Sequence, residues 1–146
     1  MYVIFNSDIL VSEIRKGTLR AYFRGIFKSK KLIIIDYKLF PELEKELDID
    51  ENIEFQNLYN EGVQLGFIIE SLDVCSLKPF FIELYHTLPF LEKNLNLSTN
   101  DRFLITLHIQ LGGELKTNDK HIHRAINWLK LEPSKWKEYA LKNHDE

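Results

Sequence analysis

Cysteine is almost absent from this chain of 146 residues, which contains only Cys75. A lone cysteine cannot form an internal disulfide, and without companions it excludes the paired cysteine spacing of a zinc ribbon. A chain of this length buries roughly two-thirds of its surface on folding and needs neither a disulfide nor a structural metal. Because this scarcity is typical of a reducing compartment, we expect a cytoplasmic protein.

Long apolar runs are also missing. No stretch approaches the roughly 20 residues that span a bilayer, and the opening MYVIFNSD lacks the basic and apolar regions of a signal peptide. Repeats and low-complexity linkers are missing as well. With 45% hydrophobic and 28% charged residues, the composition is that of a soluble globular protein. We expect one domain over residues 1–146 and no membrane association.

The net charge of −3 is small, but the charges are unevenly distributed. Residues 1–31 carry seven Lys or Arg against two acids, residues 32–100 carry four against 13, and residues 101–146 carry eight against seven. The two ends are basic and the middle is acidic. The total therefore does not exclude a polyanionic partner.

Short apolar runs alternate with segments of helical period. Because neighbouring parallel strands need a crossover connection, this alternation predicts an α/β fold, a three-layer α/β/α arrangement with a central, mostly parallel sheet of four or five strands. Strands are expected at 2–5, 32–35, within 63–72, near 115 and at 128–131. Helices are expected over 9–28 with breaks at Gly17 and Gly25, over 41–47, 48–62 closed by Gly62, 77–91, 101–111 capped by Ser98 or Asn100, and 121–127.

Polar residues follow the predicted strands or open the helices after them. The carboxyl ends of parallel strands lie at one edge of a sheet, so these side chains are expected to converge there. Converging carboxylates repel unless a cation neutralises them, and oxygen ligands without His or Cys suit Mg²⁺ or Mn²⁺. Each residue alone is also typical of a turn or a helix cap. The set is Asn6, Asp8, Asp36, Glu42, Asp101, Thr117, Asn118 and Asp119.

Two motifs in this pattern resemble those of the PIN-domain nucleases, of the kind found as VapC-type toxins in toxin–antitoxin pairs. The opening VIFNSDILVSEIRKG is similar to the first strand and acidic turn of that family. In DRFLITLHIQLGGELKTNDKH an acid opens a helix, a glycine follows it, and a Thr-Asn-Asp turn ends 18 residues after that acid, from Asp101 to Asp119. The segment IIIDYKLFPEL places Glu42 at the family's second acid. The resemblance is specific over the first 17 residues and over 101–121.

The resemblance implies a metal-dependent endoribonuclease that hydrolyses RNA phosphodiester bonds. It also implies a toxin neutralised by a small antitoxin protein, and a homodimer. Metal binding by Mg²⁺ or Mn²⁺, direct or through water, is assigned to Asn6, Glu42 and Asp101. Asp8 and Asp119 are outer ligands or position the attacking water, and Thr117 and Asn118 shape a turn or contact the phosphate.

Two departures from the family pattern affect this assignment. Asn6 stands where the family has its first acid, and the loss of a full charge lowers both metal affinity and the activation of water. The chain is therefore expected to be weakly active or inactive. Pro41 precedes Glu42 where the family continues a helix, and Glu46, one turn later on the same face, is the alternative second acid.

RNA also has to be bound. Lys16, Arg20, Arg24 and Lys28 recur every four residues and would form a basic stripe of about 18 Å on a helix. Such a stripe can follow a phosphate backbone, although a basic stripe is more often simply a solvated helix face.

Other readings of the sequence stay open. His121 and His123 could be a transition-metal pair, but two residues apart they share a face only in a strand. Trp128, Trp136 and Tyr139 are expected in core or dimer packing. The alternative functions are a non-catalytic PIN-like module that binds RNA or a protein, and a nuclease that acts on DNA.

Overall fold

The computed structural model describes residues 1–69, 77–78, 81–82, 84–86 and 97–131. The chain forms two compact units, one of Met1–Leu72 with Gly112–Thr117 and one of Asp73–Leu111 with Asn118–Glu146. The chain thus leaves the first unit, returns to it for one strand and leaves again. Cys75, Trp136, Tyr139 and most of the helix predicted over 77–91 lie outside the described residues, and the single domain stays a prediction.

The first unit alternates strands and helices in the predicted order. Each strand is a short run of aliphatic or aromatic residues, and each connection to the next strand in the sheet contains at least one helix, as a parallel sheet requires. The elements are β1 (Tyr2–Phe5), α1 (Ser7–Lys16), α2 (Leu19–Lys28), β2 (Leu32–Ile34), the short 3-10 helix η1 (Tyr37–Leu39), α3 (Phe40–Glu46), α4 (Ile49–Gln64), β3 (Ile68–Ile69) and β4 (Glu114–Lys116).

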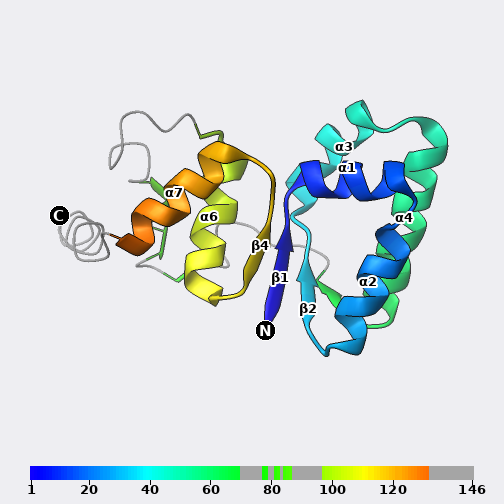
Figure 1. The fold of residues 1–146 in the computed structure, drawn as a ribbon, viewed down its shortest axis with the longest axis horizontal. Helices are drawn as coiled ribbons and strands as arrows, with labels where there is room; N and C mark the ends of the chain where they lie inside the picture. The colour runs from blue at the N-terminus through cyan, green and yellow to red at the C-terminus, as the bar shows by residue number, and fades with distance from the viewer. Residues whose placement is uncertain (70–76, 79–80, 83, 87–96, 132–146) are drawn as a thin grey trace. The chain divides into compact units, whose positions relative to one another are not determined.

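The four strands form one parallel sheet in the order β3-β2-β1-β4. Strand β1 lies between β2 and β4 (Figure 1), with Ile4 opposite Ile34 on one side and opposite Leu115 on the other. Residues on both faces of the sheet are buried, Val3 on one and Ile4 on the other. The predicted class, α/β with a parallel four-stranded sheet buried on both faces as in a three-layer fold, is confirmed.

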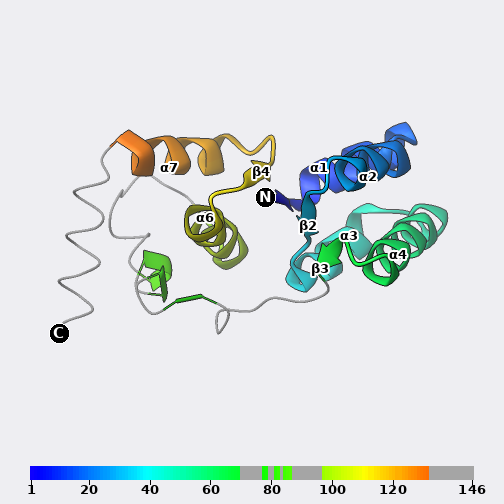
Figure 2. The ribbon, with the colours of Figure 1, turned by 90° about the horizontal axis from the view of Figure 1, so that it is seen from below.

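One face of the sheet packs against α1, α2, α3 and α4, which lie on the same side of the strands in Figure 2. Phe5 of β1 contacts Tyr22 and Phe23 of α2 edge-on, with ring centroids 5.5 and 5.8 Å apart. Leu10 of α1 and Phe55 of α4 are buried in the same cluster. This core holds the start of α1, and so the polar turn after β1, against the sheet.

The glycines of the first unit act differently from one another. Gly17 has a φ of 71° and ends α1, so the predicted break there is confirmed. The breaks predicted at Gly25 and Gly62 are wrong, because both lie inside helices. Gly62 serves close packing instead: a Cβ atom there would overlap the side chain of Ile68 on β3.

The second unit contains the helices α6 (Thr99–Leu111) and α7 (Lys120–Leu131), which pack against each other. The predicted helix over 101–111 is confirmed, with Ser98 at its start. The strand predicted at 128–131 is wrong because α7 continues through it, and Ile126 and Leu129 extend its buried face. Within the described ranges, no helix has the length and apolarity needed to cross a bilayer.

We predict that Gly62→Ala destabilises the protein by about 1–3 kcal/mol, because the added methyl group overpacks the contact between α4 and β3. Gly25→Ala is the matched control, since a Cβ atom at Gly25 meets no other atom within 4 Å. It should stabilise α2 by about 0.5–1 kcal/mol through helix propensity. Chemical denaturation of both variants measures the difference, and equal shifts would contradict the close approach at Gly62.

Candidate functional site

Asn6 joins the ends of two neighbouring strands. It directly follows β1, is 6% exposed, and caps α1 by accepting a hydrogen bond from the backbone N–H of Ser7 at 2.9 Å. Its backbone N–H donates to the carbonyl of Lys116 at 3.0 Å, and its side-chain Nδ2 donates to Thr117 Oγ1 at 3.1 Å. Both ends of the Asn6 amide therefore contribute to the structure of this edge of the sheet.

The Thr117 hydroxyl continues this chain of hydrogen bonds to Asp8. Thr117 Oγ1 lies 3.4 and 3.3 Å from the two carboxylate oxygens of Asp8. A hydroxyl that accepts from Asn6 can donate its own proton to the carboxylate, so Thr117 orients Asp8. Asp8 also accepts a hydrogen bond from the backbone N–H of Ile9 at 2.8 Å. Three residues of the predicted site, from opposite ends of the described chain, are thus brought together.

Asp8 and Glu42 line the same open cavity of about 540 Å³. Asp8 lies in the first turn of α1 and Glu42 in the first turn of α3. The cavity is also lined by Glu46, the alternative second acid, and by two cations of α1, Arg15 and Lys16. Both candidates for the second acid therefore stay open, and the cavity combines carboxylates with positive charge.

Pro41 does not disturb the start of α3. It lies in the first turn of the helix, where the missing N–H would have no intrahelical partner. The departure from the family pattern at this position is therefore compatible with a helical Glu42.

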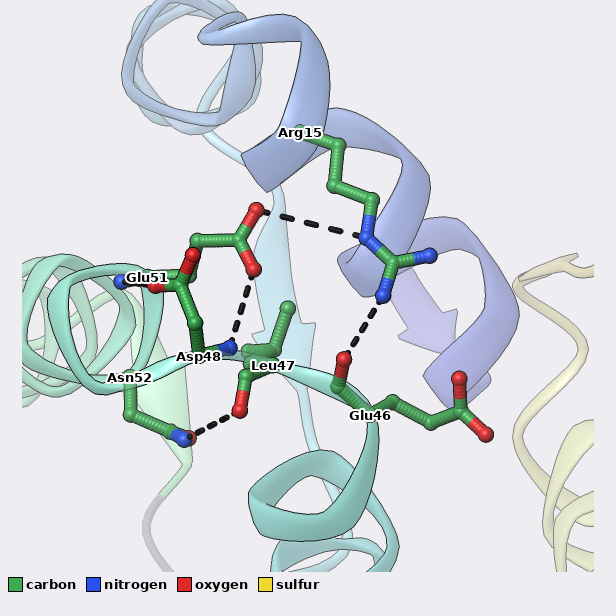
Figure 3. A network of polar contacts seen from close by, with 6 residues as sticks. All are labelled: Arg15, Glu46, Leu47, Asp48, Glu51 and Asn52. Atoms are coloured by element: carbon green, nitrogen blue, oxygen red, sulfur yellow. Dashed lines mark hydrogen bonds and ion pairs between the residues drawn. The ribbon is translucent and has the colours of Figure 1, made fainter.

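Arg15 of α1 contacts the end of α3 and the first turn of α4, as Figure 3 shows. Its Nη2 donates to the carbonyl of Glu46 at 2.6 Å, and its Nε lies 4.0 Å from a carboxylate oxygen of Glu51. Glu51 forms a reciprocal capping box with Asp48, with bonds of 2.8 and 3.0 Å, which defines the start of α4. The α1 wall with Asp8 is thereby tied to the α3 wall. Arg15 is part of the opening motif, but no role was predicted for it from the sequence.

Asp36 is a buried carboxylate at the end of β2. Its Oδ1 accepts from the backbone N–H of Lys38 at 3.1 Å and caps η1, whereas Oδ2 has no hydrogen-bond partner in the described part of the chain. Burial raises the pKa of Asp36 above its ordinary value of 3.8, against the opposing effects of the Lys38 N–H and ammonium. The side chain does not line the cavity that contains Asp8.

The predicted basic stripe is not one surface. Lys16 ends α1 and lines the cavity with Asp8, whereas Arg20, Arg24 and Lys28 lie on α2 and line a second cavity of about 280 Å³. That second cavity is largely apolar, and Arg20 pairs there with Glu61 at 3.3 Å. The turn at Gly17 divides the stripe, so of these four cations only Lys16 lines the cavity with Asp8 and Glu42.

The remaining predicted acids belong to the second unit, and both lie at helix starts. Asp101 is in the first turn of α6 and accepts from the backbone N–H of Ser98 at 3.2 Å, while its own N–H donates to Ser98 Oγ at 3.1 Å. Asp119 precedes α7 and accepts from the backbone N–H of His121 at 2.8 Å. Asn118 beside it is exposed. Helix caps are a sufficient structural role for both acids.

The carboxylates of the first unit fit a hard cation in their chemistry. Mg²⁺ keeps several waters and is commonly held by one or two protein carboxylates, which Asp8 and Glu42 can supply. A set of three or more Asp, Glu, His or Cys side chains placed to bind a metal does not occur among the described residues, His121 and His123 included. The side-chain amide of Asn6 is engaged with Ser7 and Thr117.

Comparisons with protein-family models, with curated proteins and with solved structures return no match. The relationship to PIN-domain nucleases therefore stays a prediction from the two motifs.

We predict that Asp36→Asn raises the unfolding free energy at pH 7 by about 1 kcal/mol, since it removes a buried charge while Oδ1 can still cap η1. Because the folded-state pKa of Asp36 is raised, the buried charge lowers the unfolding free energy by its full amount above that pKa. This destabilisation vanishes as the pH falls below the ordinary value of 3.8. The gain in melting temperature should therefore shrink as the pH is lowered from 7 to about 4.

The exposed Asp50 in the first turn of α4 provides a control of the same chemistry. Asp50→Asn should not stabilise the protein at pH 7. A gain at Asp36 that is independent of pH, or that is matched at Asp50, would rule out burial as its cause.

Proposed function

We propose that the protein is a PIN-like, metal-dependent endoribonuclease whose site includes the cavity of α1 and α3. One observation carries the proposal: Asp8 and Glu42, 34 residues apart in sequence, line one cavity at the carboxyl edge of a parallel sheet. This is the edge where open α/β folds gather their functional residues. The resemblance of the opening motif with Asp8, and of the segment that contains Glu42, to one nuclease family supports the same conclusion.

In this proposal Asp8 and Glu42, with Glu46 as the alternative, bind Mg²⁺ or Mn²⁺. The metal supplies a water of lowered pKa and neutralises charge on the phosphoryl oxygens. Thr117 holds the Asp8 carboxylate by its hydroxyl, and Arg15 holds the backbone of Glu46. The cation of Lys16 attracts the phosphate into the cavity. Asp101 and Asp119 of the second unit are site residues by the resemblance alone.

Asn6 limits the activity of the chain. An aspartate at this position would keep the cap on Ser7, because Asp and Asn are equally good at a helix start. It would also add the charge that the family has there. The remaining parts of the proposal are a toxin with a small antitoxin partner and a homodimer, which follow from the resemblance, and a cytoplasmic location, which follows from the scarcity of cysteine.

We predict that Asn6→Asp increases Mg²⁺- or Mn²⁺-dependent cleavage of a structured RNA at least tenfold, since the added carboxylate favours metal binding at the site. Cleavage is followed on gels with the metal present and after chelation. Isothermal titration with Mn²⁺ alone gives a second readout that does not depend on turnover.

The same background tests the second acid. Glu42→Gln in the Asn6→Asp protein should abolish the gain, and Glu46→Gln separates the two candidates. Glu44→Gln, an exposed residue of the same helix that does not line the cavity, is the control and should leave the gain intact.

A non-catalytic binding module is the second candidate, and the engagement of the Asn6 amide with Ser7 and Thr117 favours it. RNA binding without metal, with no cleavage and no Mn²⁺ binding in the Asn6→Asp variant, would replace the nuclease proposal by this one. Cleavage of DNA but not RNA would keep the chemistry and change the substrate.

A further inference from the structure

The exposed side of α7 is basic and aromatic. Residues 120–131 include three Lys or Arg and two His but no acid. Ile122, Ala125, Ile126 and Leu129 form the buried side of the helix. The opposite side carries Lys120, His123, Arg124, Asn127 and Trp128, at the spacing of one helical face.

These five side chains, which we name the α7 face, line a cavity of about 560 Å³. Lys120, His123, Arg124 and Asn127 are exposed, and Trp128 is half-buried. Lys120 and Arg124 are four residues apart, which places their backbones about 6 Å apart along the helix. The indole of Trp128 lies on the same face, one turn beyond Arg124.

We propose that the α7 face binds single-stranded RNA, with Lys120 and Arg124 on the phosphates and a base stacked on Trp128. A positively charged surface beside an aromatic ring is the combination that single-stranded nucleic acids require. Arg124 adds a planar cation that can also stack on a base. An acidic polypeptide would pair with Lys120 and Arg124 but would not require an aromatic ring beside them.

The position of the face in the chain connects it to the proposed nuclease. Asp119, one of the proposed site acids, caps α7 and directly precedes Lys120. RNA held on the α7 face would therefore lie next to that acid. The inference rests on the proposed function for its choice of RNA, whereas its test measures binding and needs no cleavage.

Binding of a labelled single-stranded RNA to the full chain is measured by fluorescence anisotropy in EDTA over a range of salt concentrations. Lys120→Glu with Arg124→Glu should weaken binding about tenfold or more. The slope of log K against log salt should fall by about 1.4, since each phosphate contact to a single strand contributes about 0.7.

Two further sets of variants separate binding from general charge and from folding. Lys78→Glu with Lys130→Glu makes the same change in net charge at exposed residues that do not line the cavity, and binding should change less than twofold. Trp128→Leu should weaken binding about fivefold or more, and Trp128→Phe should restore most of it because a ring remains.

Equal losses in the two charge-reversal variants would overturn the inference. So would tight binding of polyglutamate that Trp128→Leu does not weaken, which would assign the face to an acidic protein. If Asn6→Asp cleaves RNA while all α7 variants bind it normally, the nuclease proposal stands and the α7 face is not its RNA site. If the α7 variants lose RNA binding and the Asn6→Asp variant never cleaves, the α7 face is an RNA-binding site and the nuclease proposal fails.

Discussion

The structure of the first unit depends on the hydrogen bonds between the end of β1 and β4. Asn6 uses its backbone N–H for Lys116 and its side chain for Thr117 and Ser7, so one residue ends a strand, starts a helix and holds the neighbouring strand. Since Asn6 is almost fully buried, an unmade bond there would cost about 1–3 kcal/mol. The orientation of Asp8 follows from the same bonds through the Thr117 hydroxyl. The amide that weakens the expected metal chemistry is therefore also a structural donor.

The elements of the first unit could be predicted from sequence because their signals are local. The aliphatic runs of β1 and β2 and the left-handed turn at Gly17 need no knowledge of distant residues. The roles of Gly25 and Gly62 could not be predicted in the same way, because a glycine inside a helix resembles in sequence one that ends a helix. Gly62 serves close packing, whereas a Cβ atom at Gly25 would meet no neighbour. The prediction of a strand at the end of α7 was wrong for a related reason. Residues 128–131 are too few for the spacing of their apolar side chains to distinguish a strand from a helix.

The candidate site was predictable where a motif supplied it and not elsewhere. Asp8, Glu42 and Thr117 came from motif positions, and their common edge follows from parallel topology. Arg15 depends on how α1 meets the junction of α3 and α4, which no spacing in the sequence records. The α7 face was not predicted from the sequence, because Trp128 was assigned to a strand. Only in a helix do Trp128 and Arg124 lie on one face.

Strand β4 reaches the sheet late in the chain, more than 100 residues after its partner β1. During synthesis, β1 therefore stays an open edge until residues 114–116 have emerged from the ribosome, and unpaired edges of this kind attract other strands. Thr117 emerges with them, so Asp8 acquires the hydroxyl that orients it only when most of the chain has been made. Pairing across such a distance is slow because the loop between the strands must close first. A nascent chain would thus carry Asp8 and Glu42 well before Thr117 could orient Asp8.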